Sequence, residues 1–291
     1  MTQRQEKTAI DNYYFPPYGY LGLLLVIVFW YLNWHLEGLR SHWGFFPLWL
    51  GYILCVNGLT HRFKGSSMFI RDLRGWGLLF ILSAPVWWLF EWLNQVAGYW
   101  QYLGIESFSD WEYNIYCTIN FSIVIPAIFS TTELVTVFYS KQPYVKKVKF
   151  GGSKITQVLL FLIGLTMLLS FFIWPEYSAA LLWMSLFLIL DPLNFWLGYP
   201  SILSQTAKGN WCLVAALWMG GLLCGLFWEL WNYYSWPKWI YNVPGVNFWH
   251  VFEMPLIGYL GYLPFALELY AMYHFILGIL RLKSSLGFNC D

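Results

Sequence analysis

Two short stretches of this sequence place polar side chains in strongly apolar surroundings. They read "LFEWLNQVAGYW" and "LFWELWNYYSWPKW". Each contains a glutamate followed three residues later by an asparagine: Glu91 and Asn94 in the first, Glu229 and Asn232 in the second. Residues three apart share one face of a helix, so each ExxN pair is expected to hold a polar group, a water or an ion at one point.

A carboxylic acid in such surroundings can do acid or base chemistry without a cofactor. An apolar pocket keeps the acid neutral, so that it can protonate an alkene and promote its isomerisation or hydration. Glu91 or Glu229 is the expected acid, and Glu133 or Glu268, further along the chain, is the expected base. The two asparagines are expected to bind and orient the reacting group.

Tryptophans adjoin both ExxN pairs and predict an aromatic wall around a hydrophobic or cationic ligand. Four of them are taken as substrate-binding candidates: Trp88, Trp92, Trp228 and Trp231. Ordinary packing is the alternative explanation. Other tryptophans, among them Trp100 and Trp239, lie near predicted outer span boundaries, where aromatic belts anchor membrane helices.

The composition is that of a membrane protein. Of 291 residues, 59% are hydrophobic and 11% are charged, against about 25% charged in a soluble domain. Apolar runs long enough to span a bilayer, about 20 residues each, are predicted at 18–36, 43–60, 75–99, 113–139, 155–174, 177–198, 211–234 and 255–280. The sequence thus predicts an all-α polytopic membrane protein with about eight transmembrane helices.

The distribution of lysine and arginine predicts the orientation. With the N-terminus inside, every one of the 16 basic residues except Arg40 and Lys238 falls in a cytoplasmic segment. Because such residues collect on the cytoplasmic side, both termini are expected there. The predicted location is the plasma (inner) membrane.

The chain also contains an internal repeat. In the same order, Trp49, Asn57, Leu59, Ser67, Trp76, Glu91, Asn94, Trp100, Glu112 and Glu133 match Trp183, Asp191, Leu193, Ser201, Trp211, Glu229, Asn232, Trp239, Glu253 and Glu268. The predicted organisation is an N-terminal arm (1–17), a four-helix repeat (18–140), a basic linker (141–154), a second four-helix repeat (155–283) and a tail (284–291). An even number of spans makes the repeats parallel, with a shared cavity on their pseudo-twofold axis.

Two further acids, Asp191 and Glu253, are candidate ligand-binding residues. Asp191 precedes Pro192, so it could instead form a turn or cap a helix. Glu253 lies near the predicted outer surface, where it could simply be solvated. The stretch "HVFEMPLIGYLGYLPFALELY" has prolines and glycines that break a regular helix. It is read as a short outer element followed by the helix that bears Glu268, or as one bent helix.

Several function classes find no support. Motifs for dinucleotides, nucleoside triphosphates, zinc hydrolysis and serine hydrolysis are missing. His250 and His274 lie near acids but not in the ExxH pattern of carboxylate-bridged metals, so neither a metal nor a cofactor is predicted. A net charge of +1 argues against nucleic acid, and five cysteines without CxxC spacing predict no disulfide framework.

The expected function is an integral membrane enzyme acting on a lipid or isoprenoid in an aromatic cavity of the outer half of the bilayer. A duplicated bundle with embedded carboxylates resembles the membrane carotenoid cyclases in general plan, although their PxE(E/D) signature is missing. A proton-coupled or small-molecule transporter is the first alternative, and a lipid- or pigment-binding assembly subunit is the second. The expected partners are membrane lipid and a hydrophobic small molecule; a homo-oligomer or a larger membrane complex is left open.

Overall fold

The computed structural model describes residues 13–36, 43–139, 148–284 and 286–288. Within these ranges, seven helical segments are long and apolar enough to cross a membrane: Pro17–His35, Leu73–Ala97, Asp110–Tyr139, Lys154–Ile173, Ala180–Leu197, Cys212–Tyr233 and Leu256–Leu280. The chain therefore has the make-up of a helical multi-pass membrane protein, as its composition predicts. Most of the predicted arm, half of the predicted linker and part of the predicted tail lie outside the described residues.

The run predicted as a span at 43–60 forms a helix but is not one of these seven. It corresponds to α2 (Phe45–Lys64). Three basic or titratable residues, His61, Arg62 and Lys64, occupy its last turn. These polar residues make α2 less apolar than the other long helices.

The first half of the chain contains α1 (Pro17–His35), α2, α3 (Met68–Arg71), α4 (Leu73–Ala97), β1 (Trp100–Leu103), α5 (Asp110–Phe121) and α6 (Val124–Tyr139). The second half contains α7 (Lys154–Ile173), η2 (Pro175–Tyr177), α8 (Ala179–Leu197), α9 (Ile202–Thr206), α10 (Cys212–Tyr233), β2 (Lys238–Tyr241), β3 (His250–Val251), β4 (Met254–Pro255), η3 (Leu256–Gly261) and α11 (Tyr262–Leu280).

Local sequence explains where the helices near the candidate site begin and end. The side chain of Asp72 accepts a hydrogen bond from Gly75 N at 3.0 Å and starts α4. Gly98, with φ 67°, ends α4 in the left-handed conformation that glycine tolerates. A capping box between Ser109 and Glu112 starts α5.

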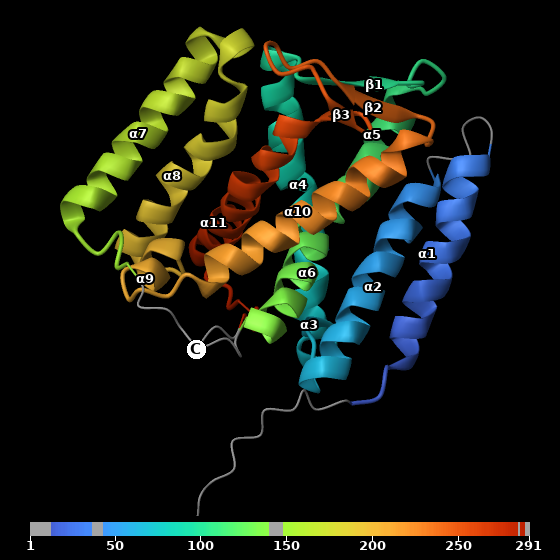
Figure 1. The fold of residues 1–291 in the computed structure, drawn as a ribbon, viewed down its shortest axis with the longest axis horizontal. Coiled ribbons are helices and arrows are strands. Elements are labelled where there is room, and N and C mark those ends of the chain that lie inside the picture. The colour runs from blue at the N-terminus through green and yellow to red at the C-terminus, as the bar shows by residue number, and fades with distance from the viewer. Residues whose placement is uncertain (1–12, 37–42, 140–147, 285, 289–291) are drawn as a thin grey trace, which may run out of the picture.

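The helices form two outer pairs around a central group (Figure 1). α1 packs along α2 on one side, and α7 packs along α8 on the other. Between these pairs lie α4, α6, α10 and α11, with α6 and α11 both packed against α10. This central group carries all four glutamates that the sequence nominates for catalysis.

Two short antiparallel ribbons, which the sequence does not predict, lie at one end of the bundle (Figure 1). In the first, β1 pairs with β2, so that Trp100 is opposite Tyr241 and Tyr102 is opposite Trp239. In the second, β3 pairs with β4. We call this end the strand end; α3 and α9 lie at the opposite end.

The segment 250–280 is not one bent helix. The chain passes through β3, β4 and the 3-10 helix η3 before α11 begins at Tyr262. The segment therefore consists of two short strands followed by a helical stretch, Leu256–Leu280, whose first part is the 3-10 helix η3. The cysteine spacing also failed to reveal a disulfide: Cys212 is disulfide-bonded, whereas Cys55, Cys117 and Cys224 are free.

Candidate functional site

An aromatic cavity of about 610 Å³ lies at the strand end of the bundle. Both halves of the chain contribute to its walls, and the central aromatic residues are Trp87, Trp100, Tyr102, Trp183, Trp228, Trp239, Tyr241, Tyr262 and Phe265. Ligand cavities in proteins typically have volumes of about 300–1,000 Å³ and largely apolar walls. The cavity is thus suited in size and chemistry to a hydrophobic ligand.

The cavity reaches the surface beside η2 and η3. Tyr177 of η2 is 80% exposed, and Leu260 and Ile257 of η3 are 58% and 47% exposed, yet all three line the cavity. These apolar residues border the opening. A hydrophobic molecule in the surrounding membrane would therefore meet apolar surface on its way in.

Glu91, on α4, lies directly behind the cavity wall. Its Oε1 accepts hydrogen bonds from Trp87 Nε1 at 2.9 Å, Trp100 Nε1 at 3.2 Å and Tyr102 Oη at 2.5 Å. All three donors line the cavity, whereas Glu91 itself is buried and does not. The carboxyl group therefore fixes three wall residues through a single oxygen.

Glu229, on α10, has a corresponding place with different partners. Its Oε1 accepts hydrogen bonds from Tyr241 Oη at 2.7 Å and Tyr262 Oη at 2.8 Å, and both tyrosines line the cavity. The glutamate is fully buried, and its Oε2 has no hydrogen-bond partner among the described residues. Oε1 of Glu229 thus accepts two donors, against three on Oε1 of Glu91, and Oε2 of Glu229 is left without a donor from the described part of the chain.

The asparagines of the ExxN pairs hold the strands of the first ribbon. Asn94 donates to Trp100 O at 2.7 Å and accepts from Trp100 N at 3.2 Å. Asn232 donates to Trp239 O at 2.7 Å and accepts from Trp239 N at 3.0 Å. Neither asparagine lines the cavity, so each acts on it by positioning a strand.

The tyrosines on the two strands keep their protons. Burial is the main cause that raises the pKa of Tyr102 and of Tyr241 well above the usual value of 10, and the neighbouring glutamate adds to the effect in each case. Both hydroxyls therefore stay protonated and remain hydrogen-bond donors at neutral pH.

The four tryptophans predicted as a wall lie in different places. Trp228 lines the cavity. Trp231 is buried in the core beside it, packed on Trp49. Trp88 donates from Nε1 to a threonine hydroxyl on α5, and Trp92 is 52% exposed on the outer face of α4. Trp100 and Trp239, assigned to a surface belt by their position in the sequence, both line the cavity.

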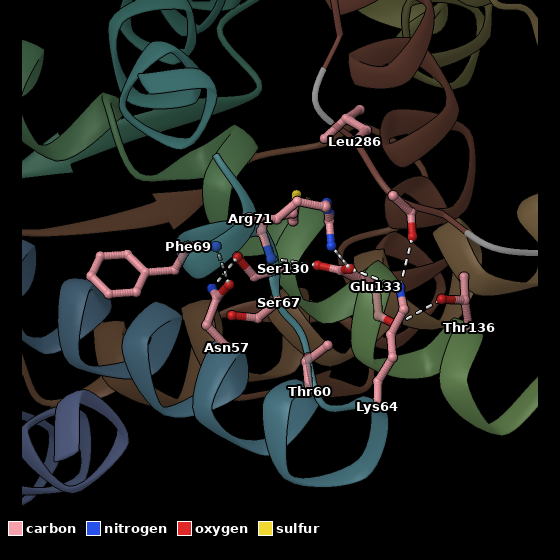
Figure 2. Close-up of polar contacts among 12 residues, drawn as sticks. Asn57, Thr60, Lys64, Ser67, Phe69, Arg71, Ser130, Glu133, Thr136 and Leu286 are labelled. Carbon is pink, nitrogen blue, oxygen red and sulfur yellow. Dashed lines mark hydrogen bonds and ion pairs between the residues drawn. The ribbon is translucent and has the colours of Figure 1, made fainter. Parts of the chain in front are cut away.

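Glu133 lies at the opposite end of the bundle, within an ion-pair cluster (Figure 2). Its Oε1 is 3.0 Å from Lys64 Nζ and 2.9 Å from Arg71 Nη1. Its Oε2 accepts a hydrogen bond from Met68 N at 2.9 Å. The carboxylate therefore ties α6 to the end of α2 and the start of α3, away from the aromatic cavity.

Asp191 lies at the same end and caps a short helix. It accepts hydrogen bonds from Ile202 N at 2.7 Å and Leu203 N at 2.9 Å, which begin α9. Its sequence counterpart Asn57 accepts from Phe69 N, in α3, at 3.1 Å. The geometry matches the helix-cap alternative for Asp191.

The remaining two candidate acids do not line the cavity either. Glu268, fully buried in α11, accepts from Leu186 N at 3.2 Å, and its Oε2 has no partner among the described residues. Glu253 is half-buried and forms an ion pair with Lys238. Lys238 lines the cavity, so this ion pair lies at its edge.

Sequence reasoning missed the tyrosines that join the glutamates to the cavity. Two of them carry a recognisable signal, because Tyr102 follows Trp100 by two residues and Tyr241 follows Trp239 by two. The repeated pattern is thus glutamate, asparagine, tryptophan and tyrosine. Tyr262 has no such signal, since it comes from the start of α11.

No group of histidine, cysteine, aspartate and glutamate in the described part of the chain is arranged to hold a metal. Comparisons with protein-family models, with curated proteins and with solved structures find no match.

Proposed function

We propose that this chain is an integral membrane enzyme that performs acid–base chemistry on a lipid or isoprenoid bound in the aromatic cavity. One observation carries the proposal. The buried glutamate of each ExxN pair reaches the cavity through tyrosine hydroxyls: Glu91 through Tyr102, and Glu229 through Tyr241 and Tyr262. Apolar cavities with a few convergent polar groups are the usual sites of small-molecule binding.

In the proposed reaction Glu229 supplies the proton. A buried carboxyl oxygen without a donor costs less free energy when the group is neutral, and Glu229 Oε2 is such an oxygen. In the reaction the Tyr262 hydroxyl, which donates to Glu229 Oε1 in this structure, turns toward the substrate and gives its proton to an alkene carbon, and the Tyr262 oxygen takes the proton of the neutral Glu229 in return. The alkene π pair forms the new C–H bond and leaves a carbocation. Loss of a proton from a neighbouring carbon to Glu229, again through Tyr262, restores a double bond at a new position.

The walls support this chemistry. Trp228 and Trp239 line the cavity, and the faces of aromatic rings attract a developing positive charge. Glu91 has a different role in the proposal, because three donors already converge on its Oε1. It holds the wall in place and does not react.

We further propose that the chain is built from two tandem, parallel four-helix repeats, at 18–140 and 155–283, with α2 as an eighth span and both termini in the cytoplasm. The matching backbone contacts of Asn94 and Asn232 support the repeat. So does the cross-paired register of β1 and β2. The distribution of basic residues supports the orientation and a location in the plasma (inner) membrane.

A transporter is the less favoured alternative. Alternating access requires a binding site that can open to both sides of the membrane. The residues that line the cavity come from the strand end, and none comes from α3 or α9. An assembly subunit that holds a lipid or pigment without turnover is compatible with the same cavity, so it must be separated from an enzyme by experiment.

The test compares wild type with Glu229→Gln, Tyr262→Phe and Glu268→Gln. Glu268 is the matched control because it is equally buried but bonded to no cavity tyrosine. Lipids bound to the purified proteins, and lipids of the host cells, are identified by mass spectrometry. The proposal expects the first two variants to retain the lipid but not to convert it, and Glu268→Gln to behave as wild type. Retention of an identical lipid by all four proteins would instead identify a binding subunit.

A further inference from the structure

A second cavity, of about 410 Å³, lies at the end of the bundle away from the strands, where α8 and α11 end. Its polar lining includes Tyr199, His274 and Arg281. We propose that this cavity binds the phosphate group of an anionic ligand, with Arg281 as the charged contact. The proposal concerns a separate site and does not depend on the chemistry proposed for the aromatic cavity.

Arg281 is an exposed cation that no acidic side chain of the described residues neutralises. Its side chain has no hydrogen-bond or ion-pair partner among the described residues, and no aspartate or glutamate lines the cavity. A guanidinium presents several N–H donors in a planar fork that matches the oxygens of a phosphate. A cavity with such a group and no acid favours an anion.

A purely structural role for Arg281 is the competing explanation, since basic residues often cap the last carbonyls of a helix. Here two carbonyls in the last turn of α11 already have backbone donors. Arg281 N donates to Gly278 O at 3.2 Å, and Leu282 N donates to Leu277 O at 2.9 Å. At the end of α8, Tyr199 N similarly donates at 2.8 Å to a carbonyl of the last turn. The guanidinium is therefore not required as a cap.

Two other side chains can add donors to a bound phosphate. His274 is 4% exposed, and its ring packs on those of Tyr270 and Tyr273 with centroids 4.4 and 5.2 Å away. The ring of Tyr199 lies against Gly278, where a Cβ would come within 2.2 Å of it. Neither His274 nor Tyr199 has a side-chain hydrogen-bond partner among the described residues.

The position of the cavity bears on the source of the phosphate. Both α8 and α11 belong to candidate spans, and the cavity lies where both end, which is the level of the lipid headgroups. Phospholipid is therefore the first source to test, and free phosphate is the second. The apolar lining residues Pro200, Leu277 and Leu282 would contact the glycerol and upper acyl chains of a lipid.

The experiment measures thermal unfolding of the full chain in detergent during three titrations: phosphatidylglycerol, phosphatidylcholine and inorganic phosphate. The proteins are wild type, Arg281→Gln, Arg281→Lys and Arg74→Gln. Arg74 is an exposed cation near the same end, at the start of α4, and is not part of the cavity. A ligand that binds only the folded state raises the unfolding temperature.

We expect phosphatidylglycerol to raise the unfolding temperature of wild type more than phosphatidylcholine does. Arg281→Gln should weaken the apparent affinity about tenfold or more, because a charge-assisted hydrogen bond is lost, whereas Arg281→Lys should retain part of it and Arg74→Gln all of it. An Arg281-dependent shift with inorganic phosphate alone would support the site with free phosphate as its ligand. Equal responses of Arg281→Gln and wild type, or no response of wild type to any titrant, would overturn the proposal.

Discussion

Replacing Asn94 by leucine should destabilise the strand end while keeping a branched side chain with the same number of heavy atoms. The substitution removes both hydrogen bonds to the backbone of Trp100. Trp100 is only 6% exposed, so water cannot easily replace the lost partners. An unsatisfied buried group costs about 1–3 kcal/mol, and two such groups give an expected loss of about 2–6 kcal/mol.

The equivalent substitution, Asn232→Leu, should cost less. Trp239 is only half-buried, so water can satisfy part of its backbone, and the expected loss is about 1–3 kcal/mol. Because β1 and β2 pair with each other, the two substitutions act on one ribbon. The double variant should therefore depart from additivity by about 0.5–3 kcal/mol.

The assay is reversible unfolding in mixed detergent, followed by tryptophan fluorescence. Gln95→Leu is the matched control, because Gln95 is exposed on the same helix beside Asn94 and should change the free energy of unfolding by no more than about 0.5 kcal/mol. If Asn94→Leu were no less stable than Gln95→Leu, the asparagine would not hold the strand, and our account of how the cavity wall is positioned would be refuted.

Three other predictions test separate parts of the structure. In Gly225→Ala the new Cβ would lie 2.3 Å from the ring of Tyr262. The substitution should lower the free energy of unfolding by about 1–3 kcal/mol and displace the proposed proton donor. The control Gly77→Ala, at a position with open space around it, should raise the free energy of unfolding by up to about 1 kcal/mol. Glu133→Gln removes the carboxylate shared by two cations and should lower the unfolding free energy by about 2–4 kcal/mol. Burial raises the pKa of Tyr102. The stabilisation that the protonated Tyr102 hydroxyl gives should therefore be fully present below about pH 10 and lost at higher pH. Unfolding measured over a pH series, with Tyr102→Phe as the reference, would show this loss.

The helical framework could be predicted from the sequence because apolar runs of sufficient length reveal themselves locally. The strands could not. β1 and β2 are four residues each, and the paired residues are separated by about half of the chain. Strand formation depends on such partners more than on the residues themselves. Nothing near Trp100 or Trp239 therefore indicates that these residues leave the surface and enter a ribbon.

The candidate site was predictable only in part for a similar reason. The cost of an acid in apolar surroundings drew attention to Glu91 and Glu229, and both lie against the cavity wall. The same argument nominated Glu133, but its ion partners Lys64 and Arg71 come from α2 and α3. Tertiary packing decides which buried acids meet a basic residue that is distant in the sequence, so the sequence alone did not separate Glu133 from Glu91 and Glu229.

The doubled ExxN pair is explained by the way the cavity is assembled. Each asparagine positions one strand, and each strand is paired with the strand from the other half, so neither wall is complete without both copies. The two ExxN segments nevertheless differ in their surroundings where the proposed chemistry occurs. When Glu133 is aligned with Glu268, the position of Tyr262 is occupied by Ala127, and Glu91 instead draws on Trp87 and Trp100. Identical halves would present a substrate with two equivalent acids; this difference allows one glutamate to hold the wall and the other to move a proton.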